Sequence, residues 1–179
     1  MDRYLRWAGK KHSLARRLAA TLPAGLLFAG LIPLGLAWFG PRADRALGLP
    51  AFPQGPLVLL AAGLIVAAGG FFGVWTVFVQ FARAEGTPLP MMPTQRLLTG
   101  GPFAWCRNPM TFGTASAYLG IALAIGAWSA LALVALGAAL LLSYIHRVEE
   151  AELELRFGQD YLQYRERTPF FFPRLPRRA

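Results

Sequence analysis

Residues 110–145 read MTFGTASAYLGIALAIGAWSALALVALGAALLLSYI, a run of 36 residues without a charged side chain. As a single helix the run would be about 54 Å long at ~1.5 Å per residue, whereas the hydrocarbon core of a bilayer is only about 30 Å thick. The run must therefore fold back on itself. Residues 126–129, Gly-Ala-Trp-Ser, are the natural bend, because glycine permits a turn and tryptophan favours the membrane interface. We expect two short spans, roughly 110–126 and 129–146, joined there by a tight turn.

Two further apolar runs lie towards the N-terminus. Residues 57–82 carry no charge, and residues 18–39 form a third candidate span despite Pro23 and Pro33. Each run reaches the roughly 20 residues that a spanning helix needs, and 55% of the chain is hydrophobic against 15% charged. The sequence therefore predicts an all-α polytopic membrane protein with about four transmembrane helices, forming a single membrane domain over residues 1–179.

The basic residues are distributed unevenly between the two predicted sides of the membrane. The formal net charge is +9, yet of the 18 Lys and Arg residues only Arg42 and Arg45 lie in the 40–56 connection. The others lie in the N-terminal segment, the 83–109 loop or the tail from Arg147, which four crossings place on one side. Because positive charge marks the cytoplasmic side, we expect an integral protein of the cytoplasmic membrane with both termini in the cytoplasm. Such a surface favours anionic lipid headgroups, rather than nucleic acid, as its partner.

Polar and ionisable residues are nearly absent within the predicted spans, which argues against a proton or ion path through the bilayer. The chemistry should then lie at the cytoplasmic rim, where the 83–107 loop precedes the third span and residues 147–164 follow the fourth. Since the tight turn makes these two spans antiparallel neighbours, we expect Asn108-Pro109 and Glu149-Glu150 to emerge close together. Two segments that are distant in sequence thus converge on one candidate site.

The loop before the third span, EGTPLPMMPTQRLLTGGPFAWCRNPM at residues 85–110, is rich in proline and glycine. Its prolines forbid a continuous helix and hold the backbone extended or turned, and Gly100 and Gly101 permit close approach of the backbone to a ligand. Irregular backbone at the membrane edge is tolerated where it lines a cavity. The alternative is a simple cytoplasmic connector of loop-like composition. The prolines are Pro88, Pro90, Pro93, Pro102 and Pro109.

The tail predicts an amphipathic helix that begins near residue 147 and lies against the membrane surface or the loop. Leu153, Phe157, Tyr161 and Tyr164 recur at helical spacing and form an apolar and aromatic stripe. Gly158 is a candidate interruption, and Pro169 should end the helix. The carboxylates of Glu149 and Glu150 leave the bilayer at the start of this helix, where the alternative role is ordinary solvated charge paired with Arg147 or His146.

Several kinds of site are not indicated. His12 and His146 stand alone, without a second ligand at the spacing of a metal site, so no metal is expected. The single cysteine, Cys106, can form no disulfide within the chain and has no base beside it. Glycine-rich nucleotide loops and the serine hydrolase motif are also absent. The residues alone therefore indicate a proline-shaped cytoplasmic pocket with two carboxylates beside it.

The loop and the tail together resemble the membrane-embedded methyltransferases of the isoprenylcysteine carboxyl methyltransferase and phospholipid methyltransferase superfamily. The resemblance covers residues 85–173, with the loop motif before the hydrophobic hairpin and RVEEAELELRFGQDYLQYRERTPFFFP after it. Residues 1–84, with the first two spans, carry no such signature. The resemblance implies an enzyme that transfers a methyl group from S-adenosyl-L-methionine, bound at the cytoplasmic side, to a lipophilic or membrane-associated acceptor.

The resemblance also assigns residues. Glu150 and Arg147 are the candidate catalytic residues, and Glu149 stands at the first glutamate of the family's pair. The expected contacts to the cofactor are Gln95, Arg96, Leu97, Leu98, Phe103, Asn108, Pro109, Met110, Thr111 and Glu149.

Three positions depart from the family pattern. Phe103 and Thr111 stand where relatives often carry tyrosine, so a hydroxyl contact is lost at each. Ile145 stands where relatives that act on a prenylcysteine carboxylate place an arginine, although Arg147 or His146 could substitute from a neighbouring turn. This weakens the carboxylate of a prenylcysteine-like compound as the acceptor and leaves the acceptor open among a lipid amine, a small hydrophobic acid and a small thiol or amine. A non-catalytic membrane scaffold or carrier with the same architecture is the alternative function.

Overall fold

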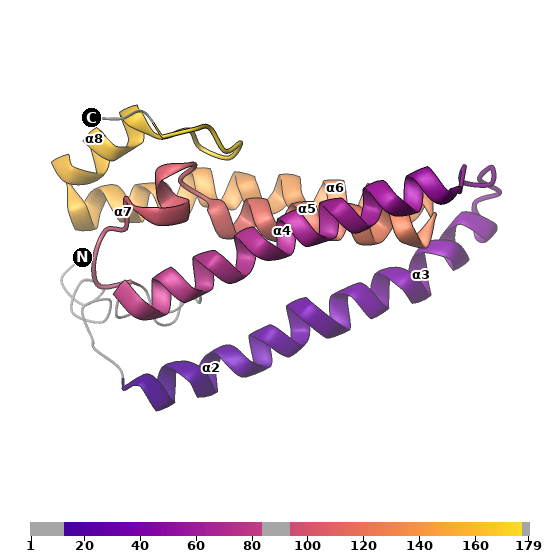
Figure 1. Ribbon diagram of the computed structural model, residues 1–179, viewed down its shortest axis with the longest axis horizontal. Helices are drawn as coiled ribbons and strands as arrows, with labels where there is room; N and C mark the ends of the chain where they lie inside the picture. The colour runs from indigo at the N-terminus through magenta and orange to yellow at the C-terminus, as the bar shows by residue number, and fades with distance from the viewer. Residues whose placement is uncertain (1–12, 84–93, 177–179) are drawn as a thin grey trace.

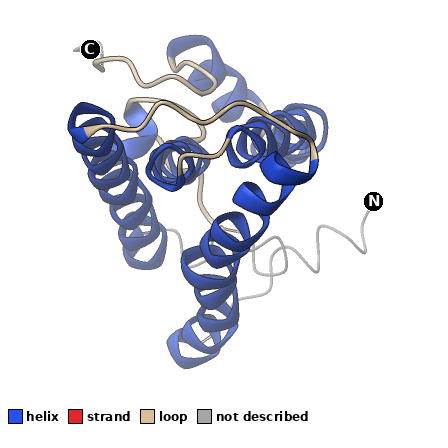
Figure 2. Cartoon of the chain, turned by 90° about the vertical axis from the view of Figure 1, so that its right-hand side faces the viewer, coloured by secondary structure: helices blue, strands red, loops and turns tan. Residues whose placement is uncertain are grey.

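The computed structural model describes residues 13–83 and 94–176, which fold into helices and loops with no strand among them (Figures 1 and 2). His12 and the prolines at 88, 90 and 93 lie outside these ranges. A short 3-10 turn, Gly101–Ala104, precedes the third long apolar segment. The helices are α2 (Leu14–Leu26), α3 (Ile32–Ala46), α4 (Pro56–Arg83), α5 (Pro109–Ile125), α6 (Trp128–Tyr144), α7 (Glu150–Phe157) and α8 (Gln159–Arg167).

Three continuous helices are long and apolar enough to cross a membrane: Ala15–Ala46, Pro56–Arg83 and Trp128–Phe157. The all-α membrane architecture predicted from the sequence is therefore confirmed for the described residues. The apolar helix α5, with 17 residues, is shorter than these three. The fourth crossing stays a prediction.

The first of these helices extends past the predicted boundary at residue 39 and ends at Ala46. A π-helical turn, Leu27–Leu31, lies between Pro23 and Pro33. Here the amide of Ile32 donates to the carbonyl of Leu27, and the same spacing would pair the carbonyl of Phe28 with Pro33, which has no N–H. The Tyr118 hydroxyl of α5 donates to that carbonyl instead, at 2.7 Å. A proline in one helix is thus compensated by a side chain from another.

The charged end of α3 stays helical because it is tied to the start of α6. The Asp44 carboxylate accepts hydrogen bonds from the backbone amides of Trp128 and Ser129, both at 2.8 Å. These amides belong to the first turn of α6, which has no side-chain cap of its own. The buried Gly40 completes the contact, since a Cβ there would lie 3.0 Å from the Cβ of Ala130.

The most extensive helix contact joins α4 to α5, and it depends on glycine. A Cβ placed on Gly113 would lie 2.6 Å from the backbone nitrogen of Gly73 and 2.7 Å from the carbonyl oxygen of Gly69. The two backbones therefore touch directly, as small residues allow within membranes.

The chain turns between α5 and α6 at Gly126, whose φ of 68° is left-handed. The two helices then run side by side (Figure 1). Contrary to the predicted break at residue 146, α6 continues through a π-helical turn, Ile145–Glu149, into α7. Nothing in this stretch breaks a helix, so the first charges mark the expected membrane edge and not a helix end. Gly158, with φ of 54°, separates α7 from α8.

Candidate functional site

The loop before α5 and the helix after α6 meet through a buried ion pair. The Arg107 guanidinium contacts the Oε1 atom of Glu150, with Nε at 2.8 Å and Nη2 at 2.7 Å. The side chains are only 11% and 6% exposed, respectively. This contact confirms that the 108–109 and 149–150 segments emerge close together. All of these elements lie at one end of the helices, together with α8 (Figure 1).

Arg107 also binds the segment that follows α8. Its Nη1 atom donates to the carbonyls of Arg165 at 2.9 Å and Thr168 at 2.8 Å, and its backbone amide donates to the carbonyl of Pro169 at 2.8 Å. The Asn108 side-chain amide donates to the carbonyl of Phe170 at 2.9 Å. One planar cation and its neighbour therefore hold the end of α8 and the tail against the loop, through charge-assisted bonds that favour Arg over Lys.

Two tyrosines of α8 fill the space behind the ion pair. The Tyr164 hydroxyl donates to the carbonyl of Phe103 at 2.7 Å, so this predicted cofactor residue already uses its carbonyl oxygen within the protein. Tyr161 is fully buried, and its hydroxyl has no hydrogen-bond partner among the described residues. Burial raises the pKa of both hydroxyls, and the charge of Glu150 raises that of Tyr161 further. Both tyrosines are therefore neutral.

The second oxygen of Glu150 contacts a histidine. The Nδ1 atom of His146 lies 3.1 Å from Oε2 of Glu150, and the His146 side chain is 68% exposed. Its ring also meets that of Phe170 edge to face, with centroids 5.4 Å apart. A shallow depression of about 360 Å³ opens here, lined by Leu142, Ser143, His146 and Phe170. An imidazole anchored by a buried carboxylate thus borders an open surface.

The other face of α7 meets the loop. Arg156 pairs with Glu152 at 3.1 Å and donates a hydrogen bond to the carbonyl of Thr94. Glu149 lies beside Glu152, close enough for their charges to interact, and it is half-buried. The described residues supply no hydrogen bond or ion pair to the Glu149 carboxylate. The two adjacent glutamates therefore differ. Both carboxylate oxygens of Glu150 contact another side chain, whereas the Glu149 carboxylate has no such partner among the described residues.

The remaining predicted residues fall into two groups. Arg147 is exposed, without a hydrogen bond or ion pair from the described residues, and the partner of Glu150 is Arg107 in its place. Arg96 is also exposed. The second group comprises the buried Pro109 and the half-buried Gln95, Leu97, Leu98, Phe103, Asn108, Met110 and Thr111.

Sequence reasoning missed the central position of Arg107. Arg107 stands in the matched motif, but most of its partners are backbone carbonyl oxygens of the tail. Because every residue has such a carbonyl, these partners cannot be recognised in the sequence. The helical stripe that contains Tyr161 and Tyr164 was visible, whereas its packing behind Glu150 was not.

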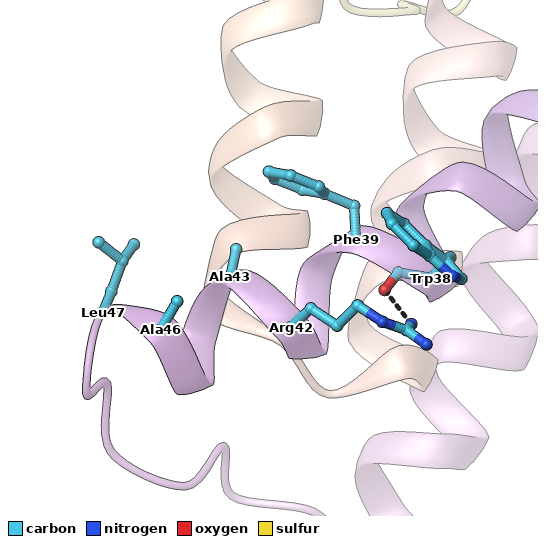
Figure 3. A pocket seen from close by; sticks show the side chains of 6 residues that line it. All are labelled: Trp38, Phe39, Arg42, Ala43, Ala46 and Leu47. Carbon is cyan, nitrogen blue, oxygen red and sulfur yellow. Dashed lines mark hydrogen bonds between the residues drawn. The ribbon is translucent and has the colours of Figure 1, made fainter.

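A second shallow depression, of about 420 Å³, lies at the opposite end of the helices, on α3 (Figure 3). Arg42 is its only charged lining residue, and its guanidinium stacks 4.4 Å over the Trp38 ring and donates to the Trp38 carbonyl at 2.6 Å. Residues Phe39, Ala43, Ala46 and Leu47 complete the lining. Across residues 13–83 and 94–176, no three His, Cys, Asp or Glu side chains gather as a metal site requires.

Comparison with known proteins gives one family and one curated relative. The sequence profile of the phospholipid methyltransferase family matches residues 58–160. The cobalt-zinc-cadmium resistance protein CzcN of Cupriavidus metallidurans is 29% identical over 120 residues, which is 67% of this chain and 51% of that protein. The chain thus spans about half the length of this relative. Because the profile runs from α4 to the start of α8 and includes both partners of the Arg107–Glu150 pair, the chain belongs to the phospholipid methyltransferase family.

Proposed function

We propose that the protein transfers a methyl group from S-adenosyl-L-methionine to a lipophilic or membrane-associated acceptor. Family membership supports methyl transfer, and the observation that carries the proposal is the contrast between the two adjacent glutamates. Glu150 is buried and held by Arg107, whereas Glu149 projects from the same rigid turn with its carboxylate unused by the described residues. A carboxylate without a partner, such as that of Glu149, next to a residue that is held rigidly, such as Glu150, is typical of a binding site. A scaffold without a ligand would not need this arrangement.

The residues between α7 and the loop fit this cofactor. The carboxylate of Glu149 would accept hydrogen bonds from ribose hydroxyls or from the ammonium group, and Arg96 would lie near the amino-acid carboxylate. Leu97 and Leu98 would cover the adenine. No described atom lies within 4 Å of the position that a Cβ on Gly100 would take, so the backbone there is open to a ligand.

The other predicted contacts support the pocket from behind. Asn108 and Phe103 hydrogen-bond to the tail and to α8, which leaves them to shape the loop, and Pro109 fixes the start of α5. Gln95, Met110 and Thr111 are half-buried beside them. When bound, the cofactor supplies an electrophilic methyl group on a sulfonium. The protein's share of the work is to hold acceptor and methyl in line and to exclude water, which alone accounts for large rate gains.

The acceptor would come from the bilayer. The depression beside His146 lies on α6, whose exposed leucines Leu140 and Leu141 face the surroundings, so an alkyl chain could lie along the helix. Ile145 is buried and apolar, so the position at which relatives carry an arginine supplies no positive charge to an acceptor carboxylate. This favours an amine over a carboxylate as the accepting group. The distribution of basic residues supports placing this end in the cytoplasm.

Calorimetry in detergent tests the proposal. Purified protein should bind S-adenosyl-L-methionine saturably, and Glu149→Gln should raise the Kd at least about tenfold, because it removes hydrogen bonds to a charged group. Glu154→Gln is the matched control, since Glu154 is an exposed carboxylate on the same continuous helix, Trp128–Phe157, and it should leave the Kd unchanged. Absence of saturable binding by the wild-type protein would favour the scaffold and reject the enzyme.

Incubation of membranes with methyl-labelled cofactor identifies the acceptor class from the product that carries the label. Label in intact lipid that survives mild base indicates an amine. Base-labile label indicates a carboxyl ester, and volatile label indicates a small thiol or amine.

A further inference from the structure

We propose that His146 is the general base of the reaction and that the depression beside it receives the acceptor's ammonium group. The inference rests on the proposed methyl transfer to an amine and adds to it a catalytic residue and an acceptor site. It is carried by a chain of contacts, Arg107 to Glu150 to His146, that ends at an open surface.

The contacts of Glu150 fix the state of the imidazole. Oε1 receives the Arg107 guanidinium, so only Oε2 is directed to His146, 3.1 Å from Nδ1. A carboxylate can only accept, so Nδ1 carries a hydrogen, and in the neutral imidazole the lone pair is then on Nε2. The Phe170 ring, 5.4 Å away and edge to face, restricts rotation of the imidazole. A carboxylate that orients a histidine in this way is the usual support for a base.

The backbone beneath His146 is also unusual. Residues Ile145–Glu149 form a π-helical turn within an otherwise regular helix. Such turns are rare and occur frequently at functional sites. Here the turn lies where the histidine, the buried Ile145 and both glutamates are placed, so the local irregularity coincides with the groups that the inference uses.

The proton balance explains why an amine acceptor needs this residue. An alkylammonium has no lone pair at neutral pH and cannot attack a methyl group. Transfer of one proton to Nε2 of His146 breaks an N–H bond and leaves the electron pair on the amine nitrogen, which then becomes the nucleophile. The amine nitrogen would form a bond to the methyl carbon as the carbon–sulfur bond breaks, and the sulfur would leave with the bonding pair as a neutral thioether. The methylated product then carries the positive charge, and His146 returns its proton to water. A carboxylate acceptor is already deprotonated and needs no base.

The depression matches an ammonium on a hydrocarbon chain. Phe170 offers an aromatic surface to the cation, Ser143 a hydroxyl oxygen, and Leu142 an apolar wall. The described lining contains no cation to repel the headgroup when His146 is neutral. The depression lies on the continuous helix Trp128–Phe157, which is long enough to pass from the bilayer to its surface.

The first experiment compares two acceptors of equal chain length, dodecylamine and dodecanoate, with the protein in dodecyl maltoside. His146→Gln should lower the rate with dodecylamine by about a hundredfold or more, the usual contribution of a general base. The rate with dodecanoate, if measurable, should stay within about twofold. Glutamine can still donate to Glu150, and His12→Gln serves as the matched control. Undiminished transfer to dodecylamine by His146→Gln, or wild-type transfer to dodecanoate alone, would overturn the inference while leaving methyl transfer intact.

The second experiment needs no turnover. The chain has two histidines, so in His12→Gln the reaction with diethyl pyrocarbonate reports on His146 alone. Dodecyltrimethylammonium, which cannot itself react, should slow this modification at least about fivefold relative to detergent alone. Ser143→Trp, which fills the depression, should abolish that protection without changing the Kd for S-adenosyl-L-methionine. If the quaternary ammonium gives no protection, the acceptor site is not at this surface, whereas loss of cofactor binding by the wild-type protein would be a failure of the proposed function itself.

Discussion

The two ends of the molecule carry shallow depressions of similar size, about 360 Å³ beside His146 and about 420 Å³ beside Trp38, yet the side chains that border them differ. At the Trp38 end, Arg42 is satisfied by its own helix. At the His146 end, a buried carboxylate directs an imidazole to the surface. Shape therefore does not distinguish the ends. The ends differ in their polar side chains: Arg42 hydrogen-bonds to the backbone of its own helix, whereas His146 is held by Glu150 and stays exposed at the surface.

Each end uses one charged side chain to satisfy backbone groups from a distant segment. The Asp44 carboxylate accepts hydrogen bonds from two backbone amides of α6, and its contacts stay within the first turn of that helix. Arg107 donates to two carbonyls of the tail and also holds Glu150. The Asp44 end is thereby closed, whereas the Arg107 end continues through Glu150 to a histidine. Substitution of Asp44 and of Arg107 should therefore have different consequences for stability and binding.

The largest effect is expected from Arg107→Met. The change leaves Glu150 buried without its partner and removes two bonds to the tail, so unfolding should become easier by about 3–5 kcal/mol. Denaturant unfolding in detergent measures the loss, and limited proteolysis should show the tail released first. Glu154→Gln breaks the exposed pair with Arg165 and should alter stability by only about 0–1 kcal/mol. Equal losses in the two variants would contradict the importance of burial.

A packing defect in the contact between α4 and α5 should affect both ends, because these two helices join them. Gly113→Ala places a methyl group 2.6 Å from the backbone of Gly73, so α4 and α5 must separate, at a loss of about 1–3 kcal/mol. Gly137→Ala on α6 is the control, because nothing lies within 4 Å of its Cβ position, and it should be neutral or slightly stabilising. Hydrogen exchange at both ends would rise in Gly113→Ala. A rise confined to one end would show that the ends are stabilised independently.

Asp44→Ala should produce a smaller loss of stability and no loss of function. The amides of Trp128 and Ser129 lose their acceptor, which lowers the unfolding midpoint, but water at the helix end can replace part of the interaction. The Kd for S-adenosyl-L-methionine should stay within about twofold of the wild-type value, as measured by calorimetry. A large change in that Kd would mean that the two ends are coupled and that the contrast between them is incomplete.

The sequence predicts these two ends to different degrees. The apolar run at 57–82 matches the helix Pro56–Arg83 closely, because lack of charge over a bilayer's thickness permits little else. The end of the first helix was predicted wrongly, since the charges near Asp44 read as a loop while their partners are backbone amides far along the chain. Arg107 was underestimated for the same reason. Backbone carbonyl and amide groups occur all along the chain. A charged side chain that pairs with them can therefore be seen in the sequence, but its partners cannot.

The last and smallest effect concerns the thiol inside the Arg107 end. Cys106 is fully buried, and burial raises its pKa to about 11, so at pH 8 only about one molecule in a thousand would carry the reactive thiolate. Iodoacetamide should therefore leave the folded protein almost unlabelled, as mass spectrometry would show, and should label it fully in dodecyl sulfate. In Arg107→Met the thiol should react faster, because the tail that covers the loop has lost its main anchor. Asp44→Ala should leave labelling unchanged, and if both variants expose Cys106 equally, the thiol reports general loosening and not the closure of one end.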